Sequence, residues 1–245
     1  PSVLFVFTSL NKILTSSQTV GRFLPETAHP YYILVPHAII EFIAAGGPSP
    51  PFFEKGIDFG SDPNSSLFLE NIKTKLANTQ KLIVANAQNY DAIYYVVGHS
   101  PAIDLYKDSA NTKLVTQVGN PVLFAMDLCG LYSFASYSLC HLIPFHTLLE
   151  IPSGESIISG RTLPAFSNRE EEMSDDVLFS LEGKISELGG KYEKTAEPRD
   201  VIVVDGNEII GHDPASSVPI AEEMLKALQK LWLGYSKQWN LPDCV

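Results

Sequence analysis

The segment SVLFVFTS, residues 2–9, carries apolar side chains at consecutive positions instead of at every second position. Because successive side chains of a strand point to opposite faces, a strand of this kind has both faces buried. The segments IIEFIAA (39–45) and YDAIYYVVG (90–98) share the pattern. Such strands are typical of a mainly parallel sheet with helices on each side, so the pattern predicts an α/β core.

Helical patterns fall between and after these strands. Apolar residues recur at a spacing near 3.6 in 65–82 and in 216–239, whereas 174–190 begins with a Ser-Asp cap and ends in glycines. The segment VIVVDGNEIIG (201–211) differs, because its central Asp-Gly-Asn is a tight-turn signal that predicts a hairpin.

The alternation of strands and helices predicts the fold class α/β, a three-layer sandwich with a mainly parallel central sheet. We expect a single domain over 1–245. Loop excursions are expected at 46–64, which is rich in Gly and Pro, and at about 107–134.

The chain carries 17 basic and 28 acidic residues, a formal net charge of −11. Binding to nucleic acid or to an anionic membrane surface needs a basic patch, so this balance argues against both.

The three cysteines, Cys129, Cys140 and Cys244, have no framework spacing, which predicts a reducing, cytoplasmic location without a disulfide scaffold. We expect no metal site, because neither a C-x-x-C pair nor an H-E-x-x-H motif occurs. The first residues lack the basic region that opens a signal peptide.

One long apolar stretch raises the question of a membrane span. Between Leu114 and Leu149 the only formally charged residue is Asp127. A spanning helix needs about 20 apolar residues, but glycines and prolines interrupt this stretch and serines and tyrosines are scattered along it. We therefore expect buried strands here and no membrane span.

Polar clusters occur where predicted strands end, at the edge of a parallel sheet where ligands bind. They are LPETAHP with Glu26 and His29, VVGHSP with Gly98 and His99, and SLCHL with Cys140 and His141. Each has a less specific interpretation: Cys140 as an inert core thiol, His99 as a loop residue, and Glu26 as a helix-surface carboxylate. The convergence of a thiol, histidines and a carboxylate on one edge favours an active site.

Five segments resemble, in this order, the ThiJ/PfpI superfamily: FLPETAHPYY, YDAIYYVVGHSPAIDL, LCH, FSNREEE and VIVVDGNEIIGHDPASS. More narrowly, they are similar to its heat-shock-protein-like branch, the glutathione-independent glyoxalase III enzymes. The resemblance runs from Val3 to about Leu228. It implies a flavodoxin-like fold, close to that of the class I glutamine amidotransferases.

The spacing to later motifs distinguishes the two cysteines that follow strand-like segments. From Cys140 the chain reaches SG at 153–154, SGRT at 159–162 and FSNREEE at 166–172, the intervals that the family shows after its Cys-His pair. These intervals are too long from Cys129, which also lacks a following His. The resemblance therefore assigns the nucleophile to Cys140.

In this family the nucleophilic Cys lies at a sharp turn from strand to helix, where the helix N-terminus favours a thiolate. The resemblance implies that Glu171 pairs with His141 and holds its ring. It also implies that a protonated Glu26 donates a hydrogen bond to the Cys140 sulfur.

Substrate binding and stabilisation of the oxyanion would fall to Gly98, His99 and Leu142, with backbone N–H groups beside Gly98 and after Cys140. The sequence departs from the family here. The usual Gly-Gly-His-Gly is Val-Gly-His-Ser, and the Gly-Pro after Cys-His is Leu-Ile. Loss of that Gly restricts the approach of a substrate to backbone amides.

The activity that the resemblance implies is conversion of methylglyoxal and other 2-oxoaldehydes to D-lactate and other 2-hydroxy acids through a hemithioacetal on Cys140. No cofactor, metal or glutathione is required, because the protein supplies the thiol. We expect a homodimer and a small 2-oxoaldehyde substrate. Two alternatives stay open: a holdase chaperone or stress-response protein whose Cys140 is a redox sensor, and another Cys-dependent hydrolase or hydratase on this fold.

Overall fold

Strands and helices alternate along the part of the chain that the structure, a computed structural model, describes. That part is residues 1–12, 21–53, 62–96, 104–105, 108–117, 123–127, 159–164, 181–193, 202–211 and 216–238. The helices are α1 (Pro25–Leu34), α2 (Pro63–Ala77), α4 (Ser109–Thr116), α7 (Leu181–Glu187) and α8 (Ser217–Gln238), with 3-10 turns η1 (Leu82–Val84) and η2 (Ala87–Asn89). The strands are β1 (Ser2–Phe7), β2 (Arg22–Phe23), β3 (Ile39–Ala44), β4 (Phe52–Phe53), β5 (Gln80–Lys81), β6 (Ala92–Tyr95), β7 (Leu123–Asp127), β8 (Thr162–Pro164), β9 (Lys191–Glu193), β10 (Ile202–Asp205) and β11 (Glu208–Gly211).

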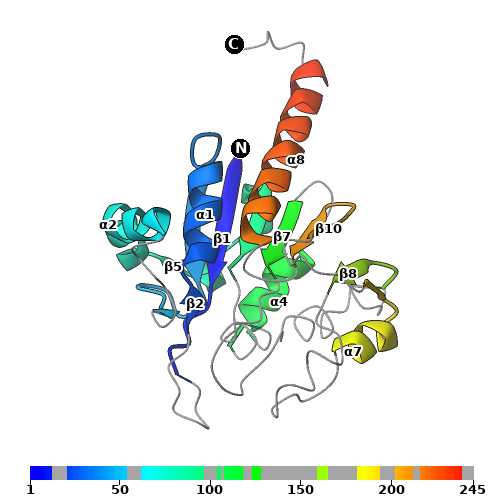
Figure 1. Cartoon of the computed structure of the whole chain (residues 1–245), viewed down its shortest axis with the longest axis horizontal. Coiled ribbons are helices and arrows are strands. Elements are labelled where there is room, and N and C mark those ends of the chain that lie inside the picture. The colour runs from blue at the N-terminus through cyan, green and yellow to red at the C-terminus, as the bar shows by residue number, and fades with distance from the viewer. Residues whose placement is uncertain are drawn as a thin grey trace.

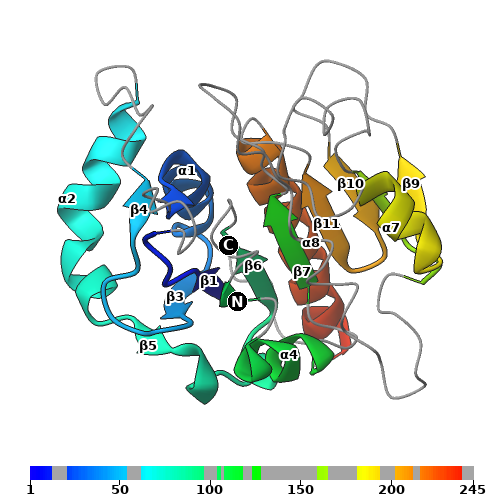
Figure 2. The same ribbon diagram turned by 90° about the horizontal axis from the view of Figure 1, so that it is seen from below.

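The main sheet has seven strands in the order β10-β11-β7-β6-β1-β3-β5, which Figure 2 shows from one side of the molecule to the other. Every neighbouring pair is parallel except β10 with β11. The chain runs from β1 outward to β3 and β5 and then returns to β6 on the other side of β1. The predicted α/β fold with a mainly parallel central sheet is therefore confirmed.

Strand β1 supplies side chains to both faces of this sheet. Val3, Phe5 and Phe7 pack in the core beneath α1, α2 and α8, whereas Leu4 and Val6 pack in the core on the side of α4 and α7. All five are buried. The consecutive apolar residues of the sequence thus fill two separate cores, as the prediction of helices on both faces requires.

Helices α1 and α8 lie side by side over one face of the sheet (Figure 1). Aromatic rings fill the space beneath α1. The ring of Tyr31 lies 5.2 Å from that of Phe68 and 5.9 Å from that of Phe42, measured between ring centroids. The edge-on contact with Phe68 and the tilted contact with Phe42 pack α1 against α2 and β3.

Helix α1 was not among the predicted helices. Pro25 occupies its start, where a missing N–H costs nothing, and Pro30 lies inside it. Most of its residues are buried, including polar ones, so it lacks the polar face that normally reveals a helix in a sequence.

The hairpin predicted at 201–211 is confirmed, since β10 and β11 pair in antiparallel fashion with Asp205 opposite Glu208. Gly206 in its turn has φ +66°, a conformation that favours glycine. The predicted strands at 2–9, 39–45 and 90–98 correspond to β1, β3 and β6.

The predicted helices at 65–82 and 216–239 correspond to α2 and α8. α2 ends at Ala77, after which the chain forms the edge strand β5 instead of continuing the helix. Of the helix predicted at 174–190, the structure describes only 181–190, where it contains α7.

The expectation of a loop excursion over about 107–134 is wrong for the two parts of it that the structure describes. Residues 109–116 form α4, because the Asp108 carboxylate accepts hydrogen bonds from the N–H groups of Ala110 and Asn111 and caps the helix. The apolar run at 123–127 forms β7, a central strand between β6 and β11.

Among the described residues, no helix is long and apolar enough to cross a membrane.

Candidate functional site

The carboxyl ends of the parallel strands meet at one edge of the sheet. β1 ends at Phe7, β3 at Ala44, β6 at Tyr95 and β7 at Asp127. The direction of the strand order changes at β1, which lies between β3 and β6. In open parallel sheets, ligands bind at the carboxyl edge beside such a point, so this edge is the candidate site.

Glu26 lies in the first turn of α1, the helix that follows β1, and its exposed fraction is 0%. Its interpretation as a helix-surface carboxylate is therefore wrong. The hydroxyl of Tyr94 on β6 donates a hydrogen bond to the backbone oxygen of Glu26 at 2.9 Å, inside the core. The turn that carries Glu26 is thus fastened to the strand that leads into the segment with Gly98 and His99.

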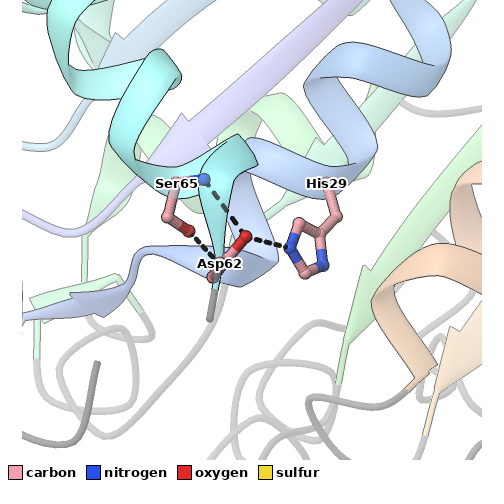
Figure 3. A network of polar contacts seen from close by, with 3 residues as sticks. All are labelled: His29, Asp62 and Ser65. Carbon is pink, nitrogen blue, oxygen red and sulfur yellow. Dashed lines mark hydrogen bonds and ion pairs between the residues drawn. The ribbon is translucent and has the colours of Figure 1, made fainter. Parts of the chain in front are cut away.

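His29 lies one turn further along α1 and faces the start of α2. Its Nε2 is 3.0 Å from Oδ1 of Asp62, and Asp62 also accepts hydrogen bonds from the N–H and the hydroxyl of Ser65 (Figure 3). Burial would raise the pKa of Asp62, but the hydrogen bonds from Ser65 and His29 outweigh it and lower that pKa. Asp62 stands between His29 and Ser65, so the three do not form a Ser-His-Asp nucleophile relay. The cluster caps α2 and joins it to α1.

A second carboxyl group at this edge was missed by the sequence analysis. Oδ2 of Asp104 accepts hydrogen bonds from the Thr8 hydroxyl at 2.9 Å and from Ser9 N–H at 2.7 Å, both just beyond the end of β1. Burial raises the pKa of Asp104, although these hydrogen bonds act in the opposite direction. Asp104 lies within YDAIYYVVGHSPAIDL, but nothing in the local pattern indicates a partner 95 or 96 residues earlier.

The other predicted site residues lie outside the described residues: Cys140, His141, Leu142, Glu171, Gly98 and His99. The predicted turn from strand to helix at Cys140 lies outside them as well. Strand β7 ends at Asp127, two positions before Cys129 (129 − 127) and thirteen before Cys140 (140 − 127). Both cysteines therefore follow the central strand β7 in the chain, and experiments on the nucleophile need Cys129 as a control.

Among the described residues, no three His, Cys, Asp or Glu side chains lie together in a way that could hold a metal ion. The polar groups described at this edge are the carboxyl groups of Glu26, Asp62 and Asp104, the His29 ring, hydroxyls and backbone N–H groups. Such groups bind and transfer protons.

The fold is that of the ThiJ/PfpI and DJ-1 proteins. A ThiJ/PfpI domain protein from Brachyspira murdochii superposes with a TM-score of 0.56 at 14% identity, over 94% of this chain and 96% of that one. The Rapid Encystment Protein 24 KDa of Francisella tularensis gives a TM-score of 0.79 at 24% identity, over 93% of this chain and 98% of that one. Glyoxalase III from Candida albicans gives 0.74 at 19% identity, over 92% and 96% of the two chains. At these identities the likeness shows the fold.

Sequence relatives carry more specific names. Glyoxalase 3 of Candida albicans is 23% identical over 243 residues, which covers 93% of this chain and 98% of that protein. The probable glutathione-independent glyoxalase hsp3103 of Schizosaccharomyces pombe is 24% identical over 62% of this chain and 58% of its own length. No family model matches the chain. The resemblance noted in the sequence is confirmed by relatives with these names and by the shared fold.

Proposed function

We propose that this protein is a glutathione-independent glyoxalase, which converts methylglyoxal and similar 2-oxoaldehydes to D-lactate and similar 2-hydroxy acids. Likeness to Glyoxalase 3 over nearly the full length of both chains supports the proposal. The structural observation that carries it is Glu26, a carboxyl group buried in the first turn of α1 at the carboxyl edge of the sheet. An enzyme that moves protons between adjacent carbons needs such a group.

In the proposed reaction the thiolate of Cys140 attacks the aldehyde carbon of the substrate and forms a hemithioacetal. A base removes the proton from that carbon, and the resulting enediol is protonated on the neighbouring carbon. The base is His141, or Glu26 after it has passed its own proton to the oxygen of the hemithioacetal. The product of this step is a thioester of the 2-hydroxy acid. Water then hydrolyses the thioester, which releases the acid and returns the thiol. The only co-reactant is water, so no external oxidant, reductant, metal or glutathione enters.

The remaining roles follow the resemblance. Glu171 holds the ring of His141 in the orientation needed for proton transfer, as paired carboxylates do in other catalytic sites. Gly98, His99 and Leu142 surround the substrate, and backbone N–H groups beside Gly98 and after Cys140 stabilise its oxyanion. Glu26 donates a hydrogen bond to the Cys140 sulfur. Burial of Glu26 supports this last role, because burial favours a neutral carboxyl group.

The proposal includes the setting of the enzyme. We expect a single ThiJ/PfpI-like domain over 1–245, a homodimer in solution and a cytoplasmic location. The partner of the site is a small molecule. Light scattering tests the dimer, and a scattering mass equal to the 26.9 kDa of one chain would contradict it.

The decisive experiment is methylglyoxal turnover by the purified protein with glutathione omitted, followed as D-lactate formed. Replacement of Cys140 by Ser should abolish turnover and leave the fold intact, because the change is nearly isosteric. Cys129→Ser is the matched control and should keep turnover. Absence of turnover in the unmodified protein would overturn the proposed function. Loss of turnover in Cys129→Ser, with Cys140→Ser active, would move the nucleophile to Cys129.

A further inference from the structure

Asp104 ties together loops that follow two different strands. Its Oδ2 accepts hydrogen bonds from Thr8 and Ser9 at the end of β1. The hydroxyl oxygen of Ser9 in turn accepts a hydrogen bond from the N–H of Gly46, just beyond β3. A Cβ atom added at Gly46 would lie 3.0 Å from both Cβ and Oγ of Ser9, so the two loops are in close contact. One carboxylate therefore holds the loop after β1 and, through Ser9, the loop after β3.

Asp104 is itself firmly held. The next residue, Leu105, is buried, and its carbonyl oxygen accepts hydrogen bonds from Asn111 Nδ2 at 3.0 Å and from Asp108 N–H at 3.1 Å. Oδ1 of Asn111 accepts a hydrogen bond from the Tyr95 hydroxyl at 2.7 Å. Hydrogen bonds to the residue after Asp104 thus connect it to α4 and, through Asn111, to Tyr95 on β6. The Asp104 carboxylate is therefore held in place where it binds Thr8 and Ser9 in the loop after β1.

The chain between β1 and Glu26 is held at both of its ends by residues on or after β6. Asp104 holds Thr8 and Ser9 at the start, and Tyr94 holds the carbonyl group of Glu26 at the end. Both ends of this connection are therefore fixed relative to β6 and the residues that follow it.

We infer that Asp104 is a positioning residue for the reaction of this site: it fixes the loops after β1 and β3, and thereby sets the orientation of the substrate relative to Glu26. The inference rests on the proposed function. Asp104 acts through Thr8 and Ser9 and takes no proton from the substrate. Hydrogen bonds to an ionised carboxylate are about twice as strong as neutral ones, which suits a carboxylate for this task.

The experiment compares Thr8→Val, Thr8→Ser and Asp104→Asn with the unmodified protein. Thr8 is fully buried, and Val keeps its volume but removes the hydroxyl that Asp104 accepts from. Ser removes a methyl group but keeps the hydroxyl. If Thr8 only fills space, Ser is the harmful change. If its hydroxyl positions the loop through Asp104, Val is the harmful change and Ser rescues.

We expect Thr8→Val and Asp104→Asn to lower kcat for methylglyoxal by about tenfold or more with little change in the shape of the pH profile, because a misplaced group loses rate without altering which groups titrate. Thr8→Ser should retain most of kcat. Hydrogen exchange, measured by mass spectrometry, supplies a readout that needs no turnover. Exchange in 8–12 and 44–49 should become about tenfold faster in the first two variants, the effect of a lost hydrogen bond to a charged group.

Each result separates the inference from the function that it rests on. Turnover by the unmodified protein together with kcat within about twofold in Thr8→Val and Asp104→Asn would overturn the positioning role and leave the glyoxalase proposal standing. Greater loss in Thr8→Ser than in Thr8→Val would assign Thr8 to packing and overturn it too. No turnover by the unmodified protein, with exchange still accelerated in the variants, would overturn the proposed function and this role within it.

Discussion

Two carboxyl groups at opposite edges of the sheet, the partly buried Asp104 and the buried Glu208, are held in different ways. Asp104, at the carboxyl edge, accepts hydrogen bonds at 2.7 and 2.9 Å from residues after β1. Glu208, at the amino end of β11, has Oε1 3.8 Å from Nε of Arg161. Among the described residues, its Oε2 is buried and has no hydrogen-bond partner, and the same holds for Oδ1 of Asp104, so the two groups differ in the oxygen that is held. Burial raises the pKa of both groups, and that of Glu208 reaches about 7.

The difference separates two uses of a buried acid. A carboxylate that accepts short, directed hydrogen bonds fixes the geometry of the segments that donate them. A buried carboxyl group whose only described polar contact is an ion pair of 3.8 Å fixes the surrounding geometry less, but its ionisation is unfavourable in the fold and makes stability depend on pH. We therefore expect changes at the carboxyl edge to affect turnover, and changes at the β10–β11 hairpin to affect stability.

The largest effect should come from Glu26→Gln. The amide keeps the size of the side chain and can donate a hydrogen bond, but it cannot transfer a proton, so kcat/KM should fall by about 10²- to 10⁴-fold. Glu208→Gln is the matched control, the same substitution at another buried Glu, and should leave kcat/KM unchanged. An equal fall of kcat/KM in the two variants, measured with methylglyoxal at one pH, would show that the carboxyl edge is not specifically the site of reaction.

Stability should depend on pH through Glu208. Its pKa rises from 4.5 to about 7 in the fold, chiefly because of burial and despite the opposing charge of Arg161. The folded protein favours the neutral form of Glu208. The contribution of this neutral acid to the free energy of unfolding is fully present below pH 4.5 and is lost as the pH rises toward 7. At about 1.36 kcal/mol per pH unit, the loss is roughly 3 kcal/mol.

Urea unfolding at several pH values measures this dependence as the difference between the unmodified protein and Glu208→Gln. Subtraction removes the contributions of other titrating groups, Asp104 among them. The two unfolding free energies should diverge between pH 4.5 and 7, with the Gln variant the more stable at high pH. Parallel curves would show that Glu208 has an ordinary pKa.

Tyr94→Phe tests whether the hydrogen bond to the Glu26 carbonyl matters for the site. Its loss should lower the unfolding free energy by about 1–3 kcal/mol, since a buried carbonyl loses its donor. It should also reduce kcat several-fold, because the first turn of α1 is then less firmly held. In the control, Tyr90→Phe, the lost hydrogen bond is to the exposed Glu41 carboxylate on β3 at 2.7 Å, and kcat should not change. A variant with reduced stability but full kcat would limit Tyr94 to a role in folding.

The smallest effect should come from His29→Ala. His29 and Asp62 are 28% and 19% exposed, and partly exposed ion pairs contribute about 0–1 kcal/mol. Asp62→Ala should cost more, about 1–2 kcal/mol, because it also removes the cap of α2. Thermal unfolding of the two variants measures both, and an equal or larger loss in His29→Ala would show that the link between α1 and α2 outweighs the cap.

The class of fold and the positions of β1, β3 and β6 follow from the sequence pattern alone. Consecutive apolar residues over a segment as short as β1 favour a strand buried on both faces, and the Asp-Gly-Asn at the β10–β11 turn favours a hairpin. The sequence also placed Glu26 at the candidate site through local motif resemblance.

Tertiary structure decided what the sequence left open. α1 is a helix because neighbours bury it on nearly all sides, and that burial removes the polar face by which a helix is recognised. The segment at 123–127 becomes a central strand through pairing with β6 and β11. Asp104 and Glu208 carry the same carboxyl group. Contacts between residues distant in the chain make Asp104 the acceptor of hydrogen bonds from the loop after β1, and they bury Glu208 beside Arg161 with a pKa of about 7. Such contacts leave no periodic mark in a sequence, because a hydrogen bond constrains positions in space and not spacing along the chain.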